Sequence, residues 1–141
     1  MNIVDELKQH HDEIRVLFKE VKKESGKYEI LKKHLIIHHE NEEKYLLDEI
    51  KKKPDLRDDS LESIEEHHIL DLMLDDLSDF PKDNERWQVK LGILQEFTEH
   101  HLEEEEEDLF PDAKEKLSDE ELNNLGEKFA EAKNKQLDAW L

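Results

Sequence analysis

The segment from His100 to Pro111 places a histidine and a glutamate four residues apart in a stretch that predicts a helix. Residues with this spacing lie on one helix face, with Cβ atoms about 5–6 Å apart, so His101 and Glu105 can reach one metal ion. An apolar stripe resumes at Leu109, and before the motif it consists of Trp87, Leu91, Leu94 and Phe97. Buried polar groups are costly unless they are paired or ligate a metal. We therefore expect an inward-facing metal site on a helix that Pro111 ends.

The same spacing recurs as His38-x-x-x-Glu42 in a second segment that predicts a helix. His34 and four adjacent pairs account for all nine histidines, and each of the first four predicted helices carries one pair. The pairs are His10-His11, His38-His39, His67-His68 and His100-His101. Neighbouring helix positions point about 100° apart, so one member of each pair is expected to face inward.

The inward members and the two glutamates form one candidate metal site: His11, His38, Glu42, His67, His101 and Glu105. The register leaves two alternatives, because a one-residue slip selects His39 with Glu43, and His10 has the same apolar neighbours as His11. Four histidines and two glutamates suit a borderline divalent ion such as iron, whereas calcium and magnesium prefer oxygen ligands alone. Glutamates from two helices can bridge two ions about 3.5–4 Å apart.

The apolar periodicity predicts five helices, over residues of about 2–24, 27–53, 59–80, 83–110 and 118–141. Gly26 is expected to cap the first helix in a left-handed conformation, and Ser118 with Glu121 predicts a capping box that starts the fifth. Short loops make successive helices antiparallel neighbours. We expect an all-α, up-down-up-down antiparallel four-helix bundle over residues of about 2–110. The additional C-terminal helix would be a lid or a dimer contact, within one domain over residues 1–141.

Composition agrees with long amphipathic helices, because 43% of residues are charged and there are only three glycines and three prolines. The net charge of −19 argues against nucleic acid and anionic membranes as partners, since both attract clustered lysine and arginine. No apolar run approaches the roughly 18 residues of a membrane span. The chain has no cysteine for disulfides or zinc–thiolate sites and no signal-like start, so we expect a cytoplasmic protein.

Both motifs resemble those of the hemerythrin-like, or HHE cation-binding, family of non-haem di-iron four-helix bundles. The fourth-helix motif of that family is a histidine, three residues, two glutamates, an apolar pair and a proline. Here it reads His101, Glu105-Glu106, Leu109-Phe110 and Pro111, and the second-helix motif reads His38, Glu42-Glu43 and Leu46-Leu47, with Asp48 where a proline is often found. The resemblance implies two iron ions with an oxo or hydroxo bridge, a small diatomic or peroxide ligand, and a monomer or homodimer.

The third predicted helix departs from the classical oxygen carriers of that family, which use two histidines four residues apart there. The positions four residues before and after His67 hold Ser63 and Asp71. The chain is therefore similar to the subgroup with four histidines and two carboxylates, which includes iron-centre repair proteins and an iron- and oxygen-sensing ubiquitin-ligase domain. This similarity implies sensing, detoxification or repair; as an enzyme the protein would be a di-iron oxidoreductase with catalase-like peroxide or nitric oxide chemistry. Iron storage or transport, and a metal-free helical interaction module, are the alternatives.

Overall fold

The computed structural model describes residues 1–140, and within them every regular element is a helix, which confirms the predicted all-α class. The α-helices are α1 (Ile3–Lys23), α2 (Tyr28–Glu42), α3 (Asp48–Ile50), α4 (Pro54–Ser78), α5 (Glu85–Glu104), α6 (Phe110–Lys116) and α7 (Asp119–Trp140). A 3₁₀ turn, η1 (Ser25–Lys27), precedes α2, and two π-helical segments, η2 (Glu43–Leu47) and η3 (Glu105–Leu109), follow α2 and α5.

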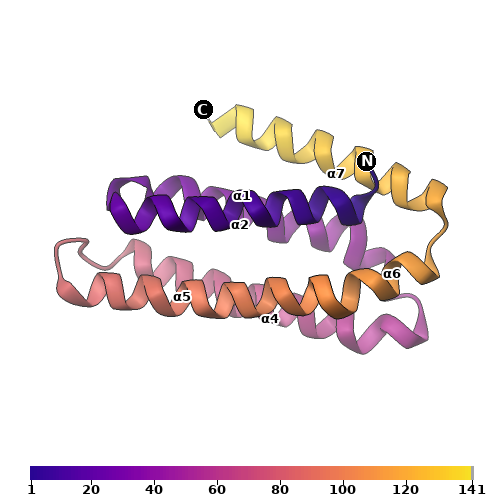
Figure 1. The fold of residues 1–141 in the computed structure, drawn as a ribbon, viewed down its shortest axis with the longest axis horizontal. Helices are drawn as coiled ribbons and strands as arrows, with labels where there is room; N and C mark the ends of the chain where they lie inside the picture. The colour runs from indigo at the N-terminus through magenta and orange to yellow at the C-terminus, as the bar shows by residue number, and fades with distance from the viewer. Residues whose placement is uncertain (141) are drawn as a thin grey trace.

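The long helices form a bundle in which α1 packs on α2 and α5, and α4 packs on α2 and α5 (Figure 1). The last helix, α7, lies outside this set and contacts α1 and α2. Its start follows the predicted capping box, since the Ser118 hydroxyl accepts from the backbone N–H of Glu121 at 3.1 Å and the Glu121 carboxylate accepts from that of Ser118 at 3.2 Å. The helix comes close to the N-terminus at Gly126, where a Cβ atom would lie 2.7 Å from the carbonyl carbon of Asn2.

The apolar core consists of two separate clusters of buried side chains. One includes Leu7 of α1, Leu46 and Leu47 of η2, and Leu109 of η3. The other includes Ile14 of α1, together with apolar residues of α2, α4 and α5. A layer of buried histidines and glutamates lies between the two clusters, because on α1 the polar pair falls between Leu7 and Ile14.

One apolar residue that was expected to face inward is exposed instead. Phe97 is 53% exposed, whereas the small polar side chain of its neighbour Thr98 is buried. Leu94, Thr98 and His101 follow steps of four and three, which a helix face accepts as readily as the predicted steps of three and four. The spacing alone therefore did not distinguish Phe97 from Thr98.

Two predicted helix boundaries and one predicted helix cap are wrong. Pro111 does not end its helix but lies in the first turn of α6, directly after η3, where its missing N–H is tolerated. Pro54 begins α4 for the same reason, five residues before the predicted start at Asp59. Gly26 does not supply a left-handed cap, because no residue of the described chain has a positive φ; α1 ends instead at an extended Glu24.

Candidate metal centre

The histidine pairs of α4 and α5 behave differently from those of α1 and α2. As predicted, His67 and His101 are buried while His68 and His100 are exposed. The pairs on α1 and α2 contradict the expectation that one member faces inward, since His10, His11, His38 and His39 are all fully buried. On α1 the cause is α7, whose Phe129 lies against the ring of His10; on α2, His38 faces α1 while His39 faces α4.

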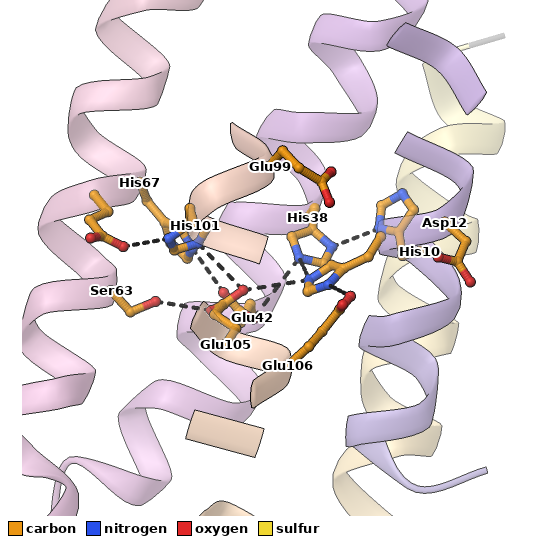
Figure 2. A network of polar contacts seen from close by, with 12 residues as sticks. His10, Asp12, His38, Glu42, Ser63, His67, Glu99, His101, Glu105 and Glu106 are labelled. Atoms are coloured by element: carbon orange, nitrogen blue, oxygen red, sulfur yellow. Dashed lines mark hydrogen bonds and ion pairs between the residues drawn. The ribbon is translucent and has the colours of Figure 1, made fainter. Parts of the chain in front are cut away.

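All six residues selected from the sequence lie together at the centre of the bundle (Figure 2). They form two overlapping groups, and within each group the candidate ligand atoms lie within 4.8 Å of one another. The α1-side group consists of His11, His38, Glu42 and Glu105, and the α4-side group consists of Glu42, His67, His101 and Glu105. Each group therefore has two histidines of its own and shares both glutamates with the other.

In the α1-side group, the Nε2 atoms of His11 and His38 lie 3.2 Å apart. The Nε2 atom of His11 is 3.5 Å from Oε1 of Glu105, and that of His38 is 4.0 Å from Oε2 of Glu42. Both imidazoles thus direct the same ring nitrogen toward the shared carboxylates.

In the α4-side group, Nε2 of His67 lies 2.8 Å from Oε1 of Glu42, and Nε2 of His101 lies 3.4 Å from Oε1 of Glu105. The other oxygen of Glu105 accepts a hydrogen bond of 3.0 Å from the hydroxyl of Ser63. Glu42 thus contacts histidines from both groups through different oxygens, while Glu105 offers one oxygen to both groups.

A second layer of carboxylates orients three of the histidines, a role that was not predicted for these residues. Glu106, Glu43 and Glu66 accept from Nδ1 of His11, His67 and His101 at 2.7, 2.8 and 2.6 Å, in that order. A carboxylate on Nδ1 fixes the ring and leaves Nε2 as a lone-pair donor, which is the usual support for a metal-binding histidine. For Glu43 and Glu106 the signal in the sequence was their place as the second glutamate of each motif, which points about 100° away from the first, toward a neighbouring helix, whereas Glu66 lies outside both motifs.

His38 is supported by a histidine instead of a carboxylate. Its Nδ1 lies 2.9 Å from Nδ1 of His10, and Nε2 of His10 lies 3.0 Å from Nδ1 of His34. Both histidines of the α1 pair therefore have defined places, His11 in the α1-side group and His10 behind His38. Of the alternative pair His39 with Glu43, Glu43 lies outside both groups and holds Nδ1 of His67 instead.

Several buried polar atoms at the centre lack a hydrogen-bond partner among residues 1–140. They are Nε2 of His39, His67 and His101, both side-chain oxygens of Glu42, and Oε1 of Glu105. The short contact between His67 and Glu42 does not have hydrogen-bond geometry. An unpartnered buried polar atom costs about 1–3 kcal/mol. Such atoms concentrated at one point, all of them good metal donors, are what a metal site requires.

The electrostatics of the centre raise the pKa of three candidate histidines, His11, His67 and His101. Burial lowers the pKa of His11, but the carboxylates of Glu105 and Glu106 outweigh it and raise that pKa to about 9. Burial is likewise outweighed at His67, where neighbouring carboxylates, Glu42 foremost, raise the pKa to about 10. Protons on these imidazoles therefore neutralise part of the buried negative charge in the metal-free protein.

The two shared glutamates differ from each other. Burial, followed by the charge of Glu105, raises the pKa of Glu42 to about 7. Burial also acts to raise the pKa of Glu105, but His101 and then other neighbours outweigh it and hold that pKa below its usual range. Burial lowers the pKa of His38 and His39 well below the usual value, so both imidazoles are neutral.

One π-helical segment begins directly after a shared glutamate and the other begins at one. η2 starts at Glu43, the residue after Glu42, and η3 starts at Glu105 itself. In η3 the backbone N–H of Phe110 donates to the carbonyl of Glu105, five residues back instead of four. Single π-helical turns are rare and occur preferentially at functional sites, so their position on both motifs marks this layer of the bundle as specialised.

Two cavities on the α4–α5 side reach the centre. One, of about 420 Å³, is lined mainly by carboxylates, including Glu62, Glu66 and Glu104, and ends at Glu105. The other, of about 530 Å³, has a largely apolar surface that includes Leu70 and ends at His101. Small molecules and ions can therefore approach the α4-side group from the surface by two routes of different polarity.

Comparison with known proteins supports the assignment of a metal centre. The family described as hemerythrin HHE cation binding domain matches residues 2–113, which include all six candidate ligands. No curated protein and no solved structure matches the chain. Within residues 1–140, no helix combines the length and apolar character needed to cross a lipid bilayer.

Proposed function

Because the chain belongs to the hemerythrin HHE cation-binding domain family, we propose that it holds two iron ions in the central layer of its bundle. One ion would be held by His11, His38 and the shared glutamates, and the other by His67, His101 and the same two glutamates. The observation that carries this proposal is the sharing of Glu42 and Glu105 between two otherwise separate donor groups. Shared carboxylates are what two neighbouring ions need as bridges.

The donor set fits iron better than the common alternatives. Zinc sites in proteins are usually tetrahedral, with three or four protein ligands around one ion. Here two carboxylates are shared between two histidine pairs, an arrangement that provides for two ions. Calcium and magnesium prefer oxygen donors, and here each group supplies two imidazoles. The unpartnered nitrogens and carboxylate oxygens support a loaded site, because the metal-free arrangement leaves them without hydrogen bonds.

We further propose that the centre binds or reacts with oxygen, peroxide or nitric oxide, in sensing, detoxification or iron-centre repair. Bound iron would supply reversible one-electron chemistry and coordination positions that the protein does not fill. The protein contributes orientation, since the carboxylates on Nδ1 hold three imidazoles in place. The apolar cavity that ends at His101 favours a small uncharged ligand, because carboxylates such as Glu65 and Glu96 line it and repel anions.

For the fold we propose an up-down-up-down antiparallel topology in a single domain. The four helical lines are α1, α2 with α3, α4, and α5 with α6. Short connections and the packing of α1 on α2 and of α4 on α5 support this topology. It accounts for four helices that each deliver ligands at one depth between the two apolar clusters.

Metal loading and spectroscopy test the proposed function. The purified protein is loaded anaerobically with Fe(II), its iron is counted per chain, and absorption is recorded with oxygen, azide, nitric oxide and hydrogen peroxide. We expect two irons per chain and bands typical of bridged di-iron centres. The variants Glu42→Ala and Glu105→Ala should each lose both irons, whereas Glu103→Ala, which removes an exposed carboxylate on the same helix, should retain them.

The outcomes separate the competing functions. A chain that binds no iron while remaining folded contradicts the proposal and leaves a metal-free interaction module. An oxygen complex that is stable for hours, without peroxide turnover, would indicate reversible oxygen carriage. It would show that the open coordination positions of the iron ions bind oxygen without a further reaction. Bound iron that responds to none of the small ligands would indicate storage or transport.

A further inference from the structure

His39 is a buried histidine at the centre that the proposed function does not use. Its side chain is fully buried, and its Nδ1 lies 2.8 Å from a carboxylate oxygen of Asp71 on α4. A carboxylate acceptor at Nδ1 places the ring proton there and leaves Nε2 as a lone-pair donor. Of the six candidate ligands, His11, His67 and His101 are held in the same way.

The ring of His39 lies on the α4 side of the centre. It stacks on the ring of His67, with centroids 4.2 Å apart and an angle of 13° between the ring planes. Its centroid is 6.3 Å from that of His101, with the rings edge to face. His38, the preceding residue, instead contacts His10 and His11 of α1. The adjacent pair on α2 is therefore divided, with one imidazole on each side of the layer.

The remaining nitrogen of His39 has no hydrogen-bond partner among the described residues, although it is fully buried. A neutral imidazole can gain a partner here only from a proton donor or a metal ion, and its ring lies close to those of three candidate ligands, with centroids 4.2 Å away for His67, 6.2 Å for His38 and 6.3 Å for His101. We propose that His39 is a fifth histidine donor, which binds through Nε2 the metal ion held by Glu42, His67, His101 and Glu105. This inference rests on the proposed metal centre.

The proposal makes the two ions chemically different. The α4-side ion would have five protein donors, whereas the α1-side ion would have four, from His11, His38 and the two shared glutamates. The ion with fewer protein donors keeps more positions for an external ligand. Asp71 becomes a positioning residue, because it orients the ring of His39 without touching the ion.

A structural role for His39 predicts different results from a ligand role. If its ring serves only to stack on His67 and pair with Asp71, its loss leaves iron binding unchanged. If Nε2 binds iron, its removal weakens one of the two iron sites. The two roles thus predict different iron affinities, whereas the stability of the metal-free protein does not distinguish them, because Nε2 is unpartnered there in either case.

The test compares the wild-type protein with His39→Phe, which keeps an aromatic ring for stacking but has no donor, and with Asp71→Ala, which frees the ring. His100→Phe is the control, since His100 is exposed. Thermal unfolding is measured with and without metal, Fe(II) affinity by chelator competition, and the two iron environments by ⁵⁷Fe Mössbauer spectroscopy.

For His39→Phe we expect an affinity for one iron reduced about 10- to 100-fold. One of two wild-type quadrupole doublets should shift while the other persists, and Asp71→Ala should affect the same doublet more weakly. Unchanged iron affinity and unchanged doublets in both variants would overturn the proposal. If His39→Phe does not fold, the same result in Asp71→Ala alone would overturn it. A wild-type protein without iron would instead contradict the proposed function itself.

Discussion

Each candidate histidine offers Nε2 to the centre, and the hydrogen-bond partner of its Nδ1 fixes the orientation of the ring. At His11, His67 and His101 Nδ1 faces a carboxylate of the outer layer, while at His38 it faces His10. The outer carboxylates therefore set the tautomer of three rings and add negative charge near the centre. Glu106 is itself held by Arg15, whose guanidinium lies 3.0 Å from the oxygen that His11 also contacts. The residues that orient the candidate ligands are thus almost as numerous as the ligands themselves.

Removing one of these outer carboxylates should weaken metal binding without removing a ligand. We expect Glu106→Ala to lower the iron affinity about 10- to 100-fold, because the ring of His11 loses the acceptor that fixes it. Glu107→Ala is the matched control, since Glu107 is the exposed neighbour, and its affinity should equal that of the wild type. Chelator competition measures both. Equal affinities for the two variants would show that Glu106 does not orient His11.

Protons bound at the metal-free centre should make iron binding depend on pH. The pKa values of about 9 for His11 and about 10 for His67 mean that both are protonated at pH 7, and iron binding requires neutral imidazoles. Binding should therefore release protons at pH 7 and become tighter as the pH rises toward 9. Calorimetry in buffers of different ionisation enthalpy measures the release, and an affinity that does not change between pH 6 and 9 would contradict it.

The same shifts have the opposite effect on the stability of the metal-free protein. A histidine whose folded-state pKa lies above the unfolded value of about 6.5 stabilises the fold fully below that pH. The stabilisation is lost as the pH rises through about 9 to 10, the values for His11 and His67. Urea unfolding of the metal-free protein should therefore show a free energy of unfolding that falls over this range, while the iron affinity rises.

At the scale of the helices, much of the arrangement was predictable because apolar spacing encodes which face is buried. The spacing of His38 with Glu42 and of His101 with Glu105 predicted residues that do come together. What spacing does not encode is the local backbone register, so the π-helical segments were missed and Pro111 was wrongly expected to end its helix. Spacing also does not show what the second histidine of an adjacent pair does, because its surroundings depend on which neighbouring helix covers that face.

The π-helical segment η3 gives a prediction at this scale. The backbone N–H of Phe110 donates to Glu105 five residues back, so deleting the exposed Glu107 would turn this bond into an ordinary α-helical one. We expect ΔGlu107 to keep the fold, because Phe110 stays opposite the same carbonyl, but to bind iron more weakly since the turn that carries Glu105 tightens.

Circular dichroism and iron titration measure the two effects of this deletion. The control is ΔGlu96, which removes an exposed residue from the regular part of α5 and so rotates every later ligand by about 100°. It should lose both fold and iron. Wild-type iron affinity in ΔGlu107 would show that the wide turn is not needed at the centre.

At the scale of the whole molecule, the polar layer is tolerated because apolar packing exists on both sides of it and α7 covers one flank. Phe129 of α7 lies edge-on to His10 and His38, with ring centroids 6.4 and 6.1 Å away. This cover buries His10, the outer member of the pair on α1. The same helix was predicted from its own periodicity, but its effect on the histidine pairs needed the position of α7 on the bundle.

The packing of α7 against the N-terminal residues can be tested with two glycines that differ in their surroundings. A Cβ atom at Gly126 would lie 2.7 and 2.8 Å from backbone atoms of Asn2 and Ile3, and backbone cannot turn aside as a side chain can. At Gly92 in α5, an added Cβ atom meets nothing within 4 Å among the described residues. We expect Gly126→Ala to lower the free energy of unfolding by about 1–3 kcal/mol through overpacking. Gly92→Ala should instead raise it by about 0.5–1 kcal/mol, because alanine favours a helix interior.

Urea unfolding measures both changes, and hydrogen exchange of the α7 amides locates the first. Exchange in Gly126→Ala should increase in α7 and in the part of α1 around His10, because lifting α7 uncovers that side chain. The α4–α5 pair should keep its protection, since α7 makes its main contacts with α1 and α2. If Gly126→Ala were as stable as Gly92→Ala, the close approach of α7 to the N-terminus would not hold the helix in place, and the burial of His10 would need another cause.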